Sequence, residues 1–242
     1  MVLKTTKTFL LLLLLPLFLG SCATVNEAER DPRDPFENFN RDVHKFNDGV
    51  DRAVLKPLAR GYQAIVPTPV DNGITNFFSN INDVVSAVNN LLQFKLTRAA
   101  SDVGRVLINT TVGVLGFMDV ASNMNLPKYG EDFGQTLGAW GADPGPYIVL
   151  PLLGPSNGRD SVGLVVDWYT DPVNYLEPDS HRFWTKALRL VDKRADLLGA
   201  SKVLDQAALD PYEFTRDAYL QKRQHDVYDG APPLDEYEYE EE

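Results

Sequence analysis

Apolar residues recur every three or four positions along most of this chain, and that period constrains its fold more than any other feature. Between residues 36 and 54, six apolar side chains follow at steps of three, four, three, four and four. Such steps place side chains on one face of an α-helix. Further helical segments are predicted over 57–65, 70–92, 95–115, 161–169, 180–198, 202–209 and 211–226. The sequence therefore predicts an all-α fold of seven or eight mostly amphipathic helices, with at most one short extended strand or hairpin.

Small polar residues, proline and glycine mark where these helices are expected to begin and end. Asp34 is expected to cap the first helix, with a proline at the first helical position, and Thr68 to cap the helix near residue 70. A break is expected near Asn82. Gly199 is expected to stop the helix over 180–198.

Two of these segments carry apolar faces that need a partner. The stripe over 36–54 is expected to pack into the core, with contact to a membrane interface as the alternative. Residues 70–92 contain only two charged side chains, Asp71 and Asp83, and their polar positions are Asn, Ser and Thr. So low a charge favours burial or lipid contact over an ordinary wet surface.

The first 22 residues have the pattern of a bacterial lipoprotein signal. Two lysines precede an apolar core that is too short to span a bilayer, and Leu19-Gly20-Ser21-Cys22 follows it like a lipobox. Residues 1–21 are therefore predicted to be a signal peptide. Cys22, the only cysteine, is predicted to carry the lipid anchor, and the single cysteine leaves no intrachain disulfide.

Charge narrows the possible partners of the remaining chain. After residue 21 there are 21 basic and 34 acidic residues, and seven of the acids fall in 229–242. We expect a polar linker over 22–33, a helical domain over 34–228 and an acidic, disordered tail over 229–242. An acidic domain argues against nucleic acid and against adhesion to anionic lipid through a basic patch. No apolar run after Cys22 approaches 18 residues, so no spanning helix is predicted.

Glycines are concentrated between residues 129 and 160. Gly130, Gly134, Gly138 and Gly141 recur at steps of four, four and three. If residues 132–140 are helical, these glycines line one face. Each glycine inside a helix costs about 1 kcal/mol relative to alanine, so the pattern indicates close approach of another backbone. The alternative is a glycine-rich loop around one helical turn.

Residues 154–158 fit the nucleophile pattern G-x-S-x-G around Ser156. The preceding residues read as helices, however, whereas such a serine sits above a parallel sheet, and a turn explains the same five residues. The three histidines His44, His181 and His225 are far apart and have no metal-ligand spacing. No phosphate-binding or dinucleotide-binding glycine motif is present. No metal and no cofactor are therefore expected.

Several ordered motifs together resemble the MlaA (VacJ) lipoprotein family. The resemblance covers most of residues 34–176 and fades in the C-terminal third. The motifs lie at 34–41, 66–70, 76–78, 89–93, 119–121, 131–138, 145–147, 150–156 and 159–160. In that family the Gly-Pro-Ser sequence is a turn of a lipid-handling protein without known catalysis.

The resemblance implies a mostly helical, ring-like single domain in the inner leaflet of the outer membrane, anchored on the periplasmic side. Its amphipathic channel would remove mislocalised phospholipids from the outer leaflet and pass them to a soluble periplasmic carrier, in association with a trimeric porin. Candidate residues for shaping the ring or the lipid path are Phe39, Asn40, Asn76, Phe77, Phe78, Gly134 and Gly138. Two alternatives remain open: a lipolytic serine hydrolase that uses Ser156, and a structural lipoprotein that only binds a porin.

Overall fold

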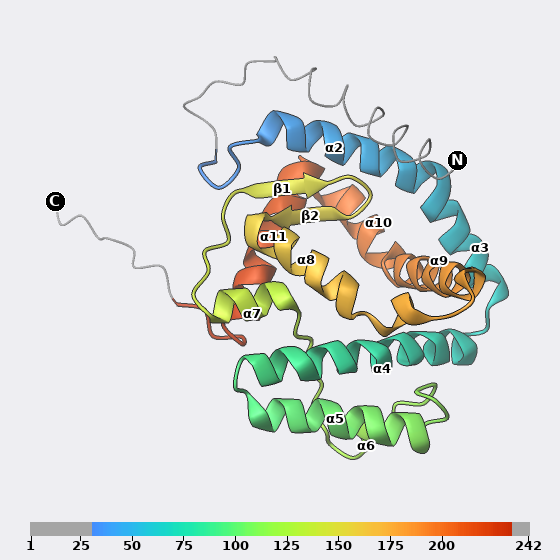
Figure 1. The fold of residues 1–242 in the computed structure, drawn as a ribbon. Helices are drawn as coiled ribbons and strands as arrows, with labels where there is room; N and C mark the ends of the chain where they lie inside the picture. The colour runs from blue at the N-terminus through green and yellow to red at the C-terminus, as the bar shows by residue number, and fades with distance from the viewer. Residues whose placement is uncertain (1–30, 234–242) are drawn as a thin grey trace, which may run out of the picture.

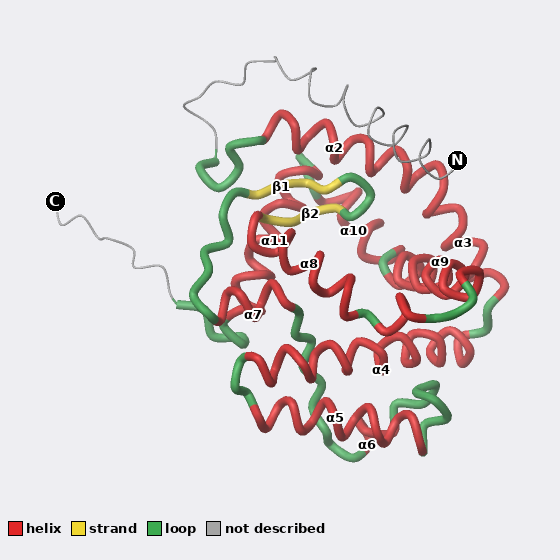
Figure 2. Tube along the Cα trace, in the orientation of Figure 1, coloured by secondary structure: helices red, strands yellow, loops and turns green. Residues whose placement is uncertain are grey.

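The computed structural model describes residues 31–233, and within them the fold is helical with a single two-stranded hairpin (Figure 1; Figure 2). The predicted all-α class is confirmed. In Figure 1, α2, α3 and α4 follow one another around the outside of the molecule. The hairpin lies beside α2, and α7 lies across the molecule from α3, so the peripheral elements form a ring-like circuit. The predicted signal peptide, Cys22, most of the linker and residues 234–242 lie outside the described residues.

The first half of the circuit is one long, nearly uninterrupted helical path. It consists of α2 (Glu37–Val50), the π-helical turn η3 (Asp51–Leu55) and α3 (Lys56–Ile65). Pro67 then ends the path, and α4 (Thr68–Leu92) follows. The expected caps Asp34 and Thr68 are both wrong, because Phe36 and Pro67 stand at the N-cap positions. The carboxylate of Asp34 is instead used in a tertiary contact with Asn40.

Helix α4 runs through its predicted break at Asn82 and packs along α5 (Leu96–Thr111). The interface between these helices is polar. Ser86 and Asn90 of α4 both hydrogen-bond to Asp102 of α5, at 2.7 and 2.8 Å. Arg105 of α5 is fully buried and donates 3.0 Å bonds to Asp83 of α4 and to Asp119 at the start of α6 (Val120–Asn123). The Asn, Ser and Asp side chains of α4 therefore face α5 inside the protein. This burial explains why α4 carries so few charged residues.

The second half contains the hairpin and the helices that fill the circuit. Helix α7 (Phe133–Ala139) is followed by the antiparallel strands β1 (Tyr147–Leu150) and β2 (Gly154–Asn157). Then come α8 (Gly158–Thr170), the 3-10 turn η4 (Pro172–Tyr175), α9 (Asp179–Asp196), α10 (Leu198–Ala207) and α11 (Pro211–Val227). Gly199 lies inside α10 and does not stop the preceding helix, so that prediction is wrong.

The apolar core is small and sits where α2, the hairpin and α11 meet. Val43, Tyr147, Val149 and Tyr212 form it, with Phe39 packed against its edge. The stripe over 36–54 is therefore only partly core. Phe36, Phe46 and Val54 are about half exposed. The expectation that the stripe packs into the core is wrong for these three side chains, because the core that α2 forms with the hairpin and α11 covers Phe39 and Val43 and leaves them outside.

The glycine-rich segment does contain a close helix crossing. Gly134 and Gly138 lie in α7, whereas Gly130 precedes this helix and Gly141 follows it with a φ of +91°. A Cβ added at Gly163 of α8 would lie 2.4 Å from the backbone nitrogen of Gly134. The predicted approach of a second backbone is therefore confirmed at Gly134, and α7 and α8 can pack this closely because both residues lack side chains.

We predict that Gly163→Ala destabilises the fold by about 1–3 kcal/mol, because the new methyl group must push α7 and α8 apart and overpacking outweighs the gain in helix propensity. Gly199→Ala is the matched control. It lies in α10 with nothing within 4 Å of the added Cβ, so its unfolding midpoint in denaturant stays the same or rises. Equal stability of the two variants would contradict the close crossing.

Candidate functional site

A cavity of about 840 Å³ lies among α4, α8, α9 and the segment that leads into α7. Each element contributes a different kind of side chain to its wall. From α8 come mainly the apolar Leu164, Val165 and Trp168, whereas α9 contributes the basic Arg189 and Lys193. The cavity is therefore amphipathic, with an apolar wall and a basic wall on two adjacent helices.

The charged groups of the wall are held by ion pairs. Arg189 of α9 bonds to Asp171 at 2.8 Å and lies 5.8 Å from the ring of Phe78. Lys128 lies 3.5 Å from Asp83, and the carboxylate of Asp83 also forms an ion pair with the buried Arg105. Because of these pairs, the wall contains both cations and carboxylates. The cavity can therefore bind a group that carries both a phosphate and an ammonium.

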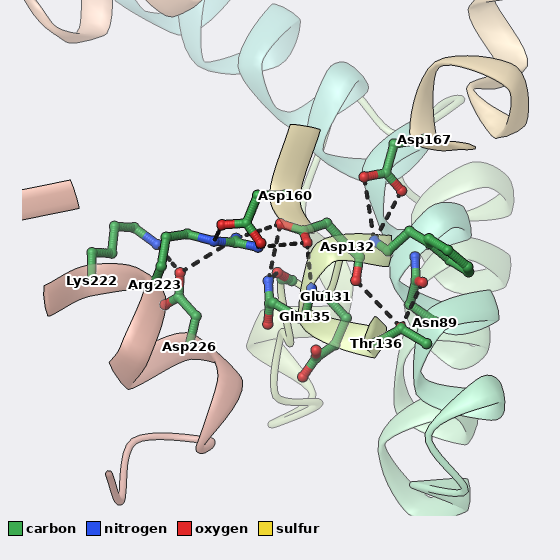
Figure 3. Close-up of polar contacts among 12 residues, drawn as sticks. Asn89, Glu131, Asp132, Gln135, Thr136, Asp160, Asp167, Lys222, Arg223 and Asp226 are labelled. Carbon is green, nitrogen blue, oxygen red and sulfur yellow. Dashed lines mark hydrogen bonds and ion pairs between the residues drawn. The ribbon is translucent and has the colours of Figure 1, made fainter. Parts of the chain in front are cut away.

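One side of the cavity is fixed by the helix that ends the domain. Arg223 of α11 reaches between the carboxylates of Asp132, at the N-cap of α7, and Asp160 of α8 (Figure 3). Its nitrogens lie 2.6 and 2.8 Å from these two carboxylates. Burial opposes the ionisation of Asp160, but hydrogen bonds from Arg223, Tyr219 and Arg159 outweigh it and hold its pKa at about 2.

Asp167 of α8 lines the same cavity and has a different environment. Its carboxylate accepts the backbone N–H of Phe133 at 3.1 Å, next to Asp132 (Figure 3). Burial raises the pKa of Asp167 to about 6, and the neighbouring negative charge of Asp132 adds to the effect. This carboxyl group therefore titrates in the weakly acidic range, within the wall of the cavity.

Asn40 is one of the residues proposed from sequence, and it lies in the small core. Its amide nitrogen donates to Asp34 at 2.7 Å and to the carbonyl of Tyr147 at 3.1 Å, and its oxygen accepts from the N–H of Val149 at 2.8 Å. This fully buried side chain joins α2 to β1. Phe39 packs against the same core.

The other predicted residues are not among those that line the cavity. The amide of Asn76 donates to the carbonyl of Phe117, and Phe77 and Phe78 stack on each other at 5.4 Å. Gly134 faces Asp160 and Arg223, and Gly138 faces Arg159 and Val227. The structure therefore brings Gly134 and Gly138 to one helix crossing, and leaves the phenylalanines of α2 and α4 in separate places.

Sequence reasoning missed the residues of the wall itself. Arg182, Lys186, Arg189 and Lys193 follow at steps of four, three and four, a period that puts all four cations on one face of α9. That spacing was a usable signal in a chain of net charge −11. The apolar Phe183 and Leu190 of the same helix are more than half exposed, whereas Asp192 and Ala195 are buried.

Ser156 does not have the setting of a nucleophile elbow. It lies in β2 of an antiparallel hairpin, is buried, and its hydroxyl is 2.9 Å from the hydroxyl of Ser161. The ring of His44 packs on Tyr212, and His225 lies beside Gly230. Within residues 31–233, no group of three or more His, Cys, Asp or Glu side chains is arranged to hold a metal ion.

The fold and the cavity define a helical protein with one large amphipathic site. The family model described as "MlaA lipoprotein" matches residues 32–226. The chain is 36% identical over 240 residues to the "Intermembrane phospholipid transport system lipoprotein MlaA" of Haemophilus influenzae, and the match spans 93% of this chain and 92% of that protein. The protein of the same name from Escherichia coli is 35% identical over 210 residues, which span 84% of this chain and 82% of that protein.

A solved structure gives the same result. A chain described with the words "Structural basis for maintenance of bacterial outer membrane lipid asymmetry" superposes with a TM-score of 0.70 and 34% sequence identity, covering 82% of this chain and 100% of its own length. The protein belongs to the MlaA lipoprotein family.

We predict that Asp167→Asn removes a pH dependence of stability between about pH 4 and pH 6. The ordinary pKa of an aspartate is 3.8, so in this range the folded wild type binds more protons than the unfolded chain, and its stability falls as pH rises. Unfolding in urea at pH 4 and pH 7 should show the wild type losing about 1–2 kcal/mol more than the variant, since partial exposure screens part of the effect.

The asparagine can still accept the N–H of Phe133, so this variant changes the titration and keeps the hydrogen bond. Asp42→Asn, on the exposed face of α2, controls for the loss of one negative charge. Identical pH profiles for the wild type and Asp167→Asn would show that Asp167 does not titrate in this range.

Proposed function

We propose that this chain is an outer-membrane lipoprotein that removes mislocalised phospholipids from the outer leaflet and passes them to a soluble periplasmic carrier. Phospholipid would travel through the cavity among α4, α8 and α9. The transport would maintain the lipid asymmetry of the outer membrane.

The amphipathic wall of the cavity is the observation that carries this proposal. A phospholipid has acyl chains that need apolar contacts and a headgroup that costs several kcal/mol to bury without polar partners. Leu164, Val165 and Trp168 of α8 suit the acyl chains, and Arg189 and Lys193 of α9 suit the phosphate. The names of the relatives, which specify phospholipid transport between membranes, support the same substrate class.

The anchor of this protein would be the acylated Cys22. Along residues 31–233, none of the helices combines the length and apolar character that a membrane span requires. Exposed apolar side chains support contact with one leaflet. A dense group follows α5 and consists of Val112, Val114, Leu115, Phe117 and Met118. Acyl chains on Cys22 together with such a surface would hold the domain on the periplasmic side of the outer membrane.

The proposed partners are a trimeric porin and the soluble carrier. Both proposals come from the family resemblance. Within the ring, Phe39, Asn40, Asn76, Phe77, Phe78, Gly134 and Gly138 are proposed to shape the lipid path indirectly. The contacts of Asn40 with β1 and the crossing at Gly134 support this role, since both fix the elements on which the cavity is built.

The transport is proposed to be passive and free of catalysis. The hydroxyl of Ser156 is buried against Ser161, in a hairpin where it supports the start of α8. A structural role for this serine accounts for its surroundings, and the lipolytic alternative gains no support from its neighbours.

We predict that Val165→Glu abolishes the phospholipid retained by the protein, because a carboxylate in the apolar wall opposes acyl chains at a cost of several kcal/mol. The measurement is mass spectrometry of the protein extracted in mild detergent. Val162→Glu is the matched control: Val162 is on the same helix and 58% exposed, against 55% for Val165, but does not line the cavity.

The control variant and Ser156→Ala should both retain phospholipid at the wild-type level. Wild-type protein that retains none would refute the proposed function. Equal loss in Val165→Glu and Val162→Glu would refute the assignment of the lipid to this cavity. Loss of lipid degradation products in Ser156→Ala would revive the hydrolase.

We also predict that a strain lacking the gene accumulates phospholipid in the outer leaflet and becomes permeable to detergents. Cys22→Ser should behave like the deletion, because a domain without its acyl chains leaves the membrane. Surface labelling of phospholipids in intact cells measures the effect, with the wild-type gene restored as control. Normal outer-leaflet composition in the deletion strain would contradict the proposal.

A further inference from the structure

An aromatic corner stands at one end of the cavity, where α8, η4 and α9 meet. It consists of Trp168 and Tyr169 at the end of α8 and Tyr175 in η4. The rings of Trp168 and Tyr169 lie edge to face at 5.0 Å, and the hydroxyl of Tyr175 donates to the carbonyl of Tyr169 at 2.6 Å. All three side chains are more than half exposed.

The corner is continuous with the cavity. Trp168 and Tyr169 belong both to the exposed corner and to the cavity wall. Their apolar bodies therefore form an unbroken surface from the outside of the molecule to the interior. In Figure 1 the end of α8 turns through η4 toward α9, and this turn carries the corner.

The basic face of α9 runs beside the same surface. Lys186 lies 5.3 Å from the ring centre of Trp168, and Arg182 donates to the carbonyl of Asn174 in η4 at 2.9 Å. About one and two turns beyond Lys186, Arg189 and Lys193 enter the cavity wall. The cations therefore follow the aromatic surface from the corner inward, in a chain whose net charge is −11.

This combination matches the headgroup level of a bilayer. Trp and Tyr are enriched there because the ring body prefers apolar surroundings while its N–H or O–H group stays hydrated. Lys and Arg at the same depth meet lipid phosphates. We propose that the aromatic corner of Trp168, Tyr169 and Tyr175 is the lipid portal, where a phospholipid passes between the bilayer and the cavity.

The portal deepens the proposed function and rests on it. A phospholipid that enters here keeps its acyl chains on the apolar residues of α8 while its phosphate moves along the cations of α9 toward Arg189 and Lys193. Helix α8 thus contacts the acyl chains while α9 contacts the phosphate of the same lipid molecule. The occupant of the corner is the bilayer itself.

The test places a single tryptophan at the corner of the full-length lipoprotein. Trp140→Phe with Trp184→Phe leaves only Trp168, and Trp168→Phe with Trp184→Phe leaves only Trp140 as the matched control. These two rings are 56% and 55% exposed, but Trp140 follows α7, does not line the cavity and donates its N–H to the carbonyl of Leu92 at the end of α4. Each protein is reconstituted in vesicles of phosphatidylethanolamine and phosphatidylglycerol with brominated acyl chains.

We expect bromines near the headgroup to quench Trp168 at least about twofold more strongly than bromines near the chain ends do, because the ring lies at the interface. We also expect the bromines near the headgroup to quench Trp168 more strongly than Trp140. Mass spectrometry of the same samples reports retained phospholipid. Unquenched Trp168 in protein that retains phospholipid would overturn the portal and leave the proposed function standing. Protein without retained phospholipid would overturn both.

A second variant tests passage. Tyr175→Asp puts a negative charge on the corner without altering the cavity wall, since Tyr175 does not line it. We expect a severalfold slower uptake of fluorescent phospholipid from vesicles, with thermal stability unchanged. Tyr228→Asp, at the end of α11, is the control and should take up lipid at the wild-type rate. Equal rates for the two variants would overturn the portal.

Discussion

Arg223 holds the last helix of the domain to its centre. The guanidinium lies between Asp132 and Asp160, so one side chain joins α11 to the start of α7 and to α8. A buried charge without its partners is costly, and each member of this group therefore requires the others. Because α8 carries the apolar wall of the cavity and Asp132 belongs to that wall, the ion-pair group fixes the position of the site itself.

The interior built around such groups is unusually polar. Arg105 between Asp83 and Asp119, Asn40 against β1 and Ser86 against Asp102 are all buried, whereas many large apolar side chains remain exposed. For a protein in water this distribution is unfavourable. The proposed placement of the domain in one leaflet, with a lipid headgroup passing through its interior, accounts for polar groups inside and apolar groups outside.

Much of the fold could be predicted from local sequence, and the errors share one cause. The periods of three and four located the helices, and the spacing of the glycines between 130 and 141 indicated the close approach of another backbone, which the structure identifies as α8 at Gly134. The cap at Asp34, the break at Asn82 and the stop at Gly199 were wrong because those residues satisfy tertiary partners or accept a helical backbone in context. The family resemblance implied an amphipathic channel, but the residues of the cavity wall were not predicted, because they come from residues 82–193, which no local pattern brings together.

The sequence by itself determined the helical class, the family and, through steps of four, three and four, the placement of four cations on one face of α9. Each depends on the spacing of neighbours along the chain. Tertiary structure alone decided which faces point inward. The polar face of α4 became interior, half of the stripe on α2 and η3 became exterior, and Trp168 came to lie beside Lys186. Spacing fixes which residues share a helix face, but the packing partner decides what that face meets.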